Sequence, residues 1–214
     1  MSYSVLIVED YLMIRQVFEG AVSMSDNFTL AASLSKASDA IEYCLDNQVD
    51  LILMDVLFPG GINGLEASRR IKEASADTKI IIVTSMPEVS YISQAMDIGV
   101  EGFWHKEVQE LPITLIMERV MNGEIIYPDS SPTVELGFAK SSEFTERELE
   151  VLRQLVSGCT NKEIADTLGI AEKTVKNHIT NMLQKTGFKT RLELAIRARD
   201  IGLVIGDSAL KIKK

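Results

Sequence analysis

Short apolar runs alternate with segments of helical periodicity along the first 125 residues of the chain. Apolar residues fill consecutive positions of these runs, which indicates strands covered on both faces, as in a parallel sheet. The runs are Val5–Val8, Thr29–Ala32, Leu51–Met54, Ile80–Val83 and Gly102–Trp104. Five strands with helices between them predict a doubly wound five-stranded parallel sheet of the α/β class.

The segments between these runs carry apolar residues at helical spacing. We expect two of them to bury one helix face each, formed by Ile14, Val17, Phe18, Ala21 and Val22 in the first and by Ala37, Ala40, Ile41, Cys44 and Leu45 in the second. Residues 65–71, 89–96 and 115–121 are less regular helix candidates.

Polar side chains stand where the predicted strands end: Glu9 and Asp10, then Asp55, Thr84 and Lys106. The carboxyl ends of parallel strands meet at one edge of a sheet, so these side chains are expected to converge. Clustered carboxylates suit a hard cation such as Mg²⁺. A carboxylate beside that ion can attack phosphorus, and an ammonium and a hydroxyl can hold the transferred group.

Each of these residues has a simpler explanation when taken alone. An aspartate after a strand is most often a helix cap, and a lysine there is most often a surface residue. The set at several strand ends is what favours a site.

Three Thr-x-x-Glu patterns predict helix starts in the last 70 or so residues, at Thr145–Glu148, Thr160–Glu163 and Thr190–Glu193. A tight turn at 169–171 leads into a helix with a buried stripe at Val175, Ile179, Met182 and Leu183. Two helices joined in this way form a helix-turn-helix. The pattern predicts a small all-α four-helix domain.

Polar residues of that third helix lie off its apolar stripe, near its amino end: Lys173, Thr174, Lys176, Asn177 and Thr180. Such residues can contact phosphates and base edges in a major groove. Lys162, Lys185, Lys189 and Arg191 are candidates for further phosphate contacts. A helical hairpin with surface lysines and no DNA role would show the same periodicity, so this alternative stays open.

Residues 123–142 lose periodicity and are rich in turn formers, which predicts a linker. The expected organisation is therefore a domain over 1–122, a linker over 123–142, a helical domain over 143–206 and a tail over 207–214. Two short apolar groups in the linker, 125–127 and 134–136, are candidates for docking on either domain, and a plain tether is an equal alternative.

Charge supports two domains with different partners. The chain has 214 residues and a net charge of −9, with 46% hydrophobic residues. Residues 1–125 hold 8 basic and 19 acidic side chains, whereas residues 144–214 hold 13 basic and 9 acidic ones. No apolar run reaches membrane-span length, and two cysteines form no disulfide framework, so we expect a cytoplasmic protein without a membrane partner.

The first domain resembles the receiver domain of bacterial two-component response regulators, a flavodoxin-like fold. The matching stretches are Val8–Asp10, Asp55–Pro59, Asn63–Ala67, Val83–Ser85 and Phe103–Lys106. The resemblance implies that Asp55 accepts a phosphoryl group from a sensor histidine kinase. It also implies Mg²⁺ (or Mn²⁺) on Glu9, Asp10, Asp55 and the carbonyl of Leu57. Thr84 and Lys106 would hold the transferred phosphoryl group. Thr84 and Phe103 would form the switch pair, the two residues that report phosphorylation to the rest of the domain.

The second domain resembles the LuxR-type DNA-binding domain, and the pair resembles the NarL/FixJ class of response regulators. The matching stretches are Phe144–Glu148, Asn161–Ala165, Leu168–Ile170 and Lys173–His178. The resemblance implies a recognition helix over about 171–185, double-stranded DNA as partner and a homodimer formed on phosphorylation. It places His178 near the DNA backbone, although a packed role suits that residue equally well.

Two rival functions are weaker. A phosphatase that turns over through an aspartyl-phosphate usually carries a second aspartate two residues after the nucleophile, and that position is Leu57. A binding protein that regulates without phosphate would not need the complete acidic set. We therefore expect a transcription factor and not an enzyme, apart from its own phosphoryl uptake and loss.

Overall fold

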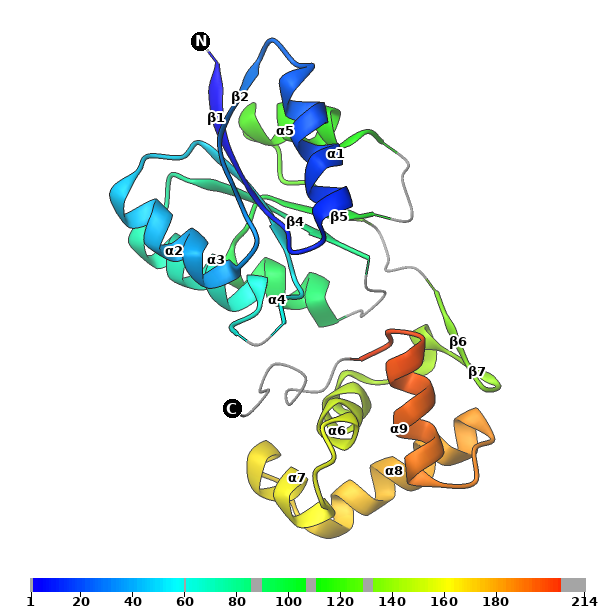
Figure 1. Cartoon of the computed structure of the whole chain (residues 1–214). Helices are drawn as coiled ribbons and strands as arrows, with labels where there is room; N and C mark the ends of the chain where they lie inside the picture. Colours follow the sequence, from blue (N-terminus) through cyan, green and yellow to red (C-terminus); the bar gives the residue numbers. More distant parts are fainter. Residues whose placement is uncertain (1, 60, 86–89, 107–110, 129–132, 205–214) are drawn as a thin grey trace. The chain divides into compact units, whose positions relative to one another are not determined.

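The computed structural model describes residues 2–59, 61–85, 90–106, 111–128 and 133–204. The described residues form two compact units: residues up to 85 and from 91 to 128 belong to the first, and residues from 133 on belong to the second. Figure 1 shows an α/β unit and a helical unit, and each is described by itself.

The first unit is built on a five-stranded parallel sheet with the strand order β2-β1-β3-β4-β5. Its strands are β1 (Tyr3–Val8), β2 (Phe28–Leu34), β3 (Leu51–Asp55), β4 (Lys79–Thr84) and β5 (Gly102–His105). Its helices are α1 (Leu12–Ser23), α2 (Ala37–Asp46), α3 (Gly64–Ala74), α4 (Ser90–Ile98) and α5 (Ile113–Met121). Helices α1 and α5 cover one face of the sheet and α2, α3 and α4 the other (Figure 1), which confirms the doubly wound fold.

The sheet is the buried centre of this unit. Every residue of β3 is buried, as expected for a strand covered on both faces. The expected helix faces are only partly confirmed, because Val17 is 64% exposed and Leu45 is 69% exposed. Phe18 and Val22, one turn apart, carry the packing of α1, so its buried stripe is narrower than the sequence pattern.

The second unit holds four α-helices among its described residues: α6 (Glu146–Val156), α7 (Asn161–Leu168), α8 (Glu172–Thr186) and α9 (Arg191–Asp200). The first two predicted capping boxes form, at Thr145 with Glu148 and at Thr160 with Glu163. The third forms only in half. The hydroxyl of Thr190 accepts from the amide of Glu193, but the Glu193 carboxylate accepts from the amide of Lys189. Gly169 closes α7 at φ +65°.

The predicted linker is divided between the two units where the structure describes it. Ile126 forms a parallel bridge with Gly102 at the free edge of β5. Further on, β6 (Glu135–Leu136) and β7 (Ala139–Lys140) pair as a hairpin, followed by the 3₁₀-helix η1 (Ser141–Glu143). Leu136 and Ala139 are each 1% exposed and belong to the apolar core of the helical unit. Residues 134–142 are thus part of that unit.

No helix among the described residues is long and apolar enough to span a membrane.

Candidate functional sites

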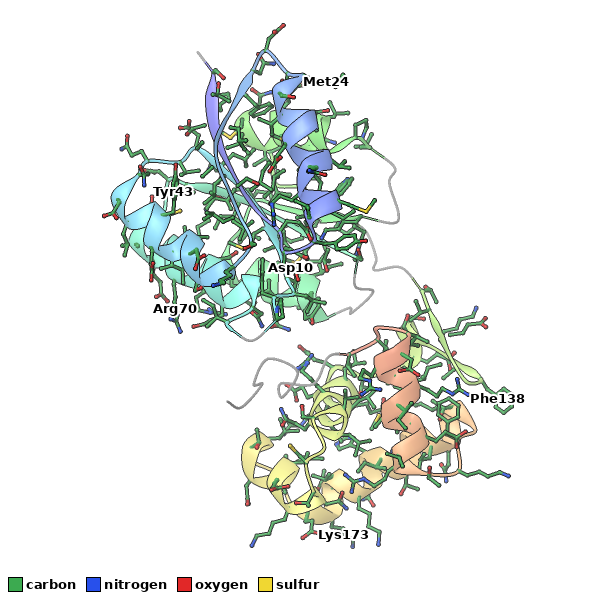
Figure 2. The ribbon with its side chains drawn as sticks, in the orientation of Figure 1. Asp10, Met24, Tyr43, Arg70, Phe138 and Lys173 are labelled. Atoms are coloured by element: carbon green, nitrogen blue, oxygen red, sulfur yellow. The ribbon has the colours of Figure 1, made fainter. Side chains whose placement is uncertain are left out.

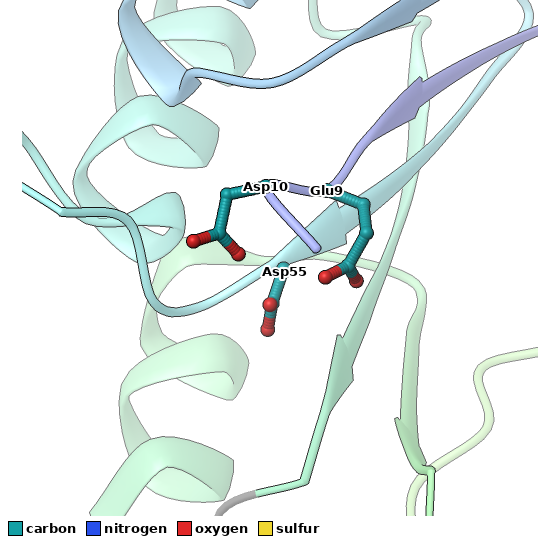
Figure 3. Close-up of side chains that lie close together, drawn as sticks. All are labelled: Glu9, Asp10 and Asp55. Carbon is teal, nitrogen blue, oxygen red and sulfur yellow. The ribbon is translucent and has the colours of Figure 1, made fainter. Parts of the chain in front are cut away.

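An acidic cluster lies at the carboxyl edge of the sheet. Glu9 and Asp10 follow β1, and Asp55 ends β3, so three side chains from two adjacent strands meet (Figure 3). One carboxylate oxygen from each residue lies within 4.8 Å of the others. Glu9 is 1% exposed and Asp55 6%, whereas Asp10 is open to solvent. Carboxylates at this spacing form a donor set for a hard divalent cation.

Lys106 joins two of these carboxylates. Its Nζ lies 2.5 Å from Oε2 of Glu9 and 3.0 Å from Oδ2 of Asp55. Its position is fixed from the backbone, because its amide donates to the carbonyl of Thr84 at 2.9 Å. The other oxygen of Asp55 accepts from the amide of Val56 at 2.7 Å. The site therefore places one ammonium among three carboxylates.

The electrostatic setting of Asp55 follows from its burial. The pKa of Asp55 is raised to about 7, chiefly because burial removes the carboxylate from water; the charge of Glu9 adds to this rise, and Lys106 and the Val56 amide oppose it. Added positive charge stabilises the ionised form of a carboxylate in this setting. The cluster is accordingly suited to a cation and to a group such as phosphoryl that binds cations.

Thr84 and Phe103 lie on neighbouring strands near this site. Thr84 ends β4 and is fully buried, and Phe103 in β5 is 2% exposed. In the β4–β5 register Thr84 pairs with His105 and Ile82 pairs with Phe103. Phe103 and His105 are therefore alternate residues of one strand face, with ring centroids 5.1 Å apart.

Sequence reasoning missed the part that two residues play here. Gly64 opens α3 against β3, and a Cβ at this position would lie 1.7 Å from the carbonyl oxygen of Asp55. The Asn63–Gly64 pair before a helical pattern was the available signal. His105 is 4% exposed, and neither ring nitrogen has a hydrogen-bond partner within the described residues. It does not join the acidic cluster found there.

The helix-turn-helix places most of the predicted DNA contacts on its surface. Four of the predicted residues of α8 are exposed, and two, Thr174 and His178, are half-buried. The exposed ones are Lys173, Lys176, Asn177 and Thr180, and Lys162 is exposed on α7. Val175, Ile179 and Met182 form the buried stripe of α8, so this polar face points away from the core (Lys173 in Figure 2).

Two other candidate phosphate contacts, Lys185 and Arg191, form hydrogen bonds within the helical unit. Lys185 donates to Glu148 at 2.7 Å and to the carbonyl of Glu143 at 2.9 Å. Arg191 donates to the Asn161 side chain at 2.9 Å and to the carbonyl of Cys159 at 2.8 Å. Lys189, by contrast, is exposed.

Both halves of the chain match known families. Residues 5–118 match the family described as response regulator receiver domain. Residues 142–198 match the bacterial regulatory proteins of the luxR family. The chain belongs to the two-component response regulators that join a receiver to a LuxR-type helix-turn-helix, and it is a transcription regulator of that class.

Relatives named as response or transcriptional regulators match nearly the whole chain. A nitrate/nitrite response regulator protein homolog of Haemophilus influenzae is 31% identical over 198 residues, covering 90% of this chain and 94% of that protein. The transcriptional regulatory protein DesR of Bacillus subtilis is 31% identical over 199 residues, covering 93% and 98%.

Among solved structures, the response regulator RcsB in complex with DNA has a TM-score of 0.62 at 18% identity and covers 94% of this chain and 100% of that one. RcsB of Salmonella enterica serovar Typhimurium, bound to promoter P1flhDC in the presence of the phosphomimetic BeF₃⁻, has a TM-score of 0.63 at 18% identity and covers 92% and 98%. At this identity the likeness shows the fold alone.

Proposed function

We propose that Asp55 is the phosphoryl acceptor of this regulator and that a sensor histidine kinase supplies the phosphoryl group. The carrying observation is the meeting of three carboxylates and Lys106 at Asp55 in a receiver fold. Glu9, Asp10 and Asp55, with the carbonyl of Leu57, would hold Mg²⁺ (or Mn²⁺). The three carboxylates fit that ion by donor chemistry, and its charge would offset the negative charge of the phosphoryl oxygens.

The bonds made and broken in the transfer step would lie between Asp55 and a phosphohistidine of the kinase. An oxygen of Asp55 attacks the phosphorus of a phosphohistidine, the nitrogen–phosphorus bond breaks, and the imidazole leaves with its electron pair. Lys106 would exchange its contact with Asp55 for one with a phosphoryl oxygen, and the Thr84 hydroxyl would donate to another. Position 57 is a half-buried leucine, so the general acid of an aspartyl-phosphate phosphatase is absent there.

The proposed output is DNA binding by a dimer. The exposed face of α8, with Lys162 of α7, would contact double-stranded DNA, and His178 would lie beside the backbone or pack within the unit. Thr84 and Phe103 would report phosphorylation and bring two chains together as a homodimer on paired half-sites. RcsB structures that contain DNA and a phosphomimetic support this scheme by likeness of fold.

Two further assignments belong to this proposal. A protein that meets a kinase domain and chromosomal DNA works in the cytoplasm. The tail would begin near residue 207.

Light scattering tests the proposal most directly. Wild type and Asp55→Asn are compared with and without Mg²⁺ and beryllium fluoride, a phosphoryl mimic. We expect a shift from monomer to dimer in the wild type alone. No shift in either protein would contradict phosphorylation-controlled dimerisation, and an equal shift in both would contradict Asp55 as the acceptor.

A further inference from the structure

Three aromatic rings follow one another from the edge of the phosphoryl site to the segment after α5. His105, the neighbour of Lys106, contacts Phe103 edge to face at 5.1 Å between centroids. Phe103 in turn stacks with Tyr127, with centroids 6.5 Å apart and an interplanar angle of 26°. Tyr127 belongs to the segment that sequence reasoning treated as a linker. One buried ring therefore touches both the strand end that carries Lys106 and the start of the connection to the helical unit.

Backbone and hydroxyl bonds hold the Tyr127 segment on β5. The amide of Ile126 donates to the carbonyl of Glu101, and the amide of Phe103 donates to the carbonyl of Ile126, both at 2.9 Å. The Tyr127 hydroxyl donates to the carbonyl of Val100 at 2.7 Å. Burial raises the pKa of Tyr127 to about 12, so the hydroxyl stays a donor at neutral pH. The segment forms an added edge to the sheet and packs over the Phe103 ring.

The same connection is anchored at its far end on the last residue of α8. Ser141 ties Val134 in place, because its amide donates to the Val134 carbonyl at 2.8 Å and its hydroxyl accepts from the Val134 amide at 3.1 Å. The amide of Phe138 then donates to the carbonyl of Thr186, the last residue of α8, at 3.1 Å. Only residues 128–133 lie between the anchored Tyr127 and the anchored Val134.

We propose that Tyr127 is a positioning residue of the switch: its ring holds Phe103 in the resting arrangement, and Ile126 and Tyr127 leave the edge of β5 when Asp55 is loaded. This rests on the proposed function, in which Phe103 reports phosphorylation; we take that report to be a turn of its ring. A ring that is 2% exposed turns only if its packed neighbours yield, and the stacked neighbour is Tyr127. The departure of Ile126 and Tyr127 lengthens the tether by these two residues, which changes the reach of the connection between the units.

Amide hydrogen exchange on the full chain tests the release. Wild type and Asp55→Asn are compared with and without Mg²⁺ plus beryllium fluoride, and ¹⁹F NMR reports whether the fluoride complex is bound. We expect the Phe103 and Ile126 amides of loaded wild type to exchange about fivefold faster or more, with no change in Asp55→Asn. If the beryllium fluoride complex binds but the exchange rates of these amides stay the same, the release of the segment is overturned and the proposed function stands. No bound fluoride overturns the proposed function and this inference with it.

Substitutions at Tyr127 distinguish coupling of this residue to the loading of Asp55 from a purely structural role. Tyr127→Leu removes the stacked ring and the hydroxyl, and Tyr127→Phe keeps the ring. Tyr43→Leu is the matched control, because the Tyr43 hydroxyl also donates to a backbone carbonyl, that of Ala31 at 3.2 Å, on another element. We expect Tyr127→Leu to bind beryllium fluoride roughly three- to tenfold more tightly, since the resting state has lost its contact.

The two other variants complete the comparison. Tyr127→Phe should show a smaller gain and Tyr43→Leu none. A Tyr127→Leu protein that melts at lower temperature but binds the fluoride complex with unchanged affinity would show a structural role only and overturn the coupling.

Discussion

The ammonium nitrogen of Lys106 lies 3.0 Å from Oδ2 of Asp55, so the proposed phosphoryl acceptor already has a cation against it. The same nitrogen contacts Glu9, which is 1% exposed. Lys106 therefore offsets part of the negative charge of the two buried carboxylates, and a divalent cation at the cluster would compete with it for them. Under the proposed function, Lys106 would exchange its contact with these carboxylates for one with a phosphoryl oxygen.

Lys106→Met should make the fold depend on metal. Removal of one partner from a buried ion pair costs about 3–5 kcal/mol when the other partner stays charged. We expect a lower melting temperature than wild type without Mg²⁺ and a clearly smaller difference with Mg²⁺, measured by calorimetry. Lys79→Met is the control, because Lys79 pairs with Glu101 at the start of β4. A deficit in Lys106→Met that Mg²⁺ leaves unchanged would argue against ion binding beside this lysine.

Thr84→Ala should separate loading from output. Thr84 is fully buried at the end of β4, and the variant loses the hydroxyl that would meet the phosphoryl group. We expect beryllium fluoride to bind with affinity reduced by roughly tenfold or less, because one hydrogen bond of about 1 kcal/mol is lost, while dimer formation at saturation disappears. Light scattering at saturating fluoride measures this, and Thr84→Ser should dimerise. If the loaded Thr84→Ala protein dimerises as the wild type does, Thr84 has no part in the switch.

Lys176→Ala should weaken DNA binding through charge. Lys176 is exposed on α8, and each lost phosphate contact lowers the slope of log affinity against log salt by roughly 1. Fluorescence anisotropy of a labelled duplex at several salt concentrations gives the slope. Lys140 is an exposed lysine of β7, so Lys140→Ala is the matched control and should retain the wild-type slope. A lost sequence preference with an unchanged slope would instead assign Lys176 to a base.

Glu148 should make the helical unit sensitive to acid. It is 3% exposed and accepts from the Thr145 amide at 2.8 Å and from Lys185 at 2.7 Å. Burial acts to raise its pKa, but the bonds from Lys185 and Thr145 outweigh this, so the pKa of Glu148 lies below its ordinary value. Since the folded pKa is the lower one, this stabilisation is complete above the ordinary pKa of 4.5 and is lost as pH falls through the folded pKa.

Glu148→Gln should therefore destabilise the unit at pH 7 and matter less in acid. We expect a loss of roughly 1–3 kcal/mol at neutral pH, read from the exchange of α6 amides, and a smaller difference from wild type below the ordinary pKa. Glu163→Gln occupies the same capping-box position on α7 but is exposed, so its effect should be smaller. Equal effects of the two substitutions at every pH would contradict a special role for the buried pair.

The parts of this protein that sequence reasoning predicted are those with strong periodicity. Continuous apolar runs identified the sheet, and the rule that parallel strands share one edge brought Glu9, Asp10, Asp55 and Lys106 together before any coordinates. The sequence could therefore predict that these residues lie close together. It could not predict that Lys106 contacts both Glu9 and Asp55, because that depends on side-chain packing, which periodicity does not encode.

Short elements and edge docking escaped prediction. Strands of two residues, such as β6 and β7, are too short to show alternation, so the turn formers around Gly137 favoured a linker. The role of Tyr127 depends on where its segment docks, and no local pattern specifies the free edge of β5. Val17 is expected inside because it lies three residues after Ile14 and four before Ala21, yet the sheet covers only part of that face.

The β6–β7 hairpin also bears on how such regulators are taken apart and recombined. The LuxR family match begins at residue 142, after Leu136 and Ala139 have entered the core of the helical unit. A chimera that exchanges receivers at residue 142 would discard those side chains and the Phe138 amide that caps Thr186. The transferable module of this protein therefore begins near residue 133, and a fusion junction belongs upstream of the hairpin.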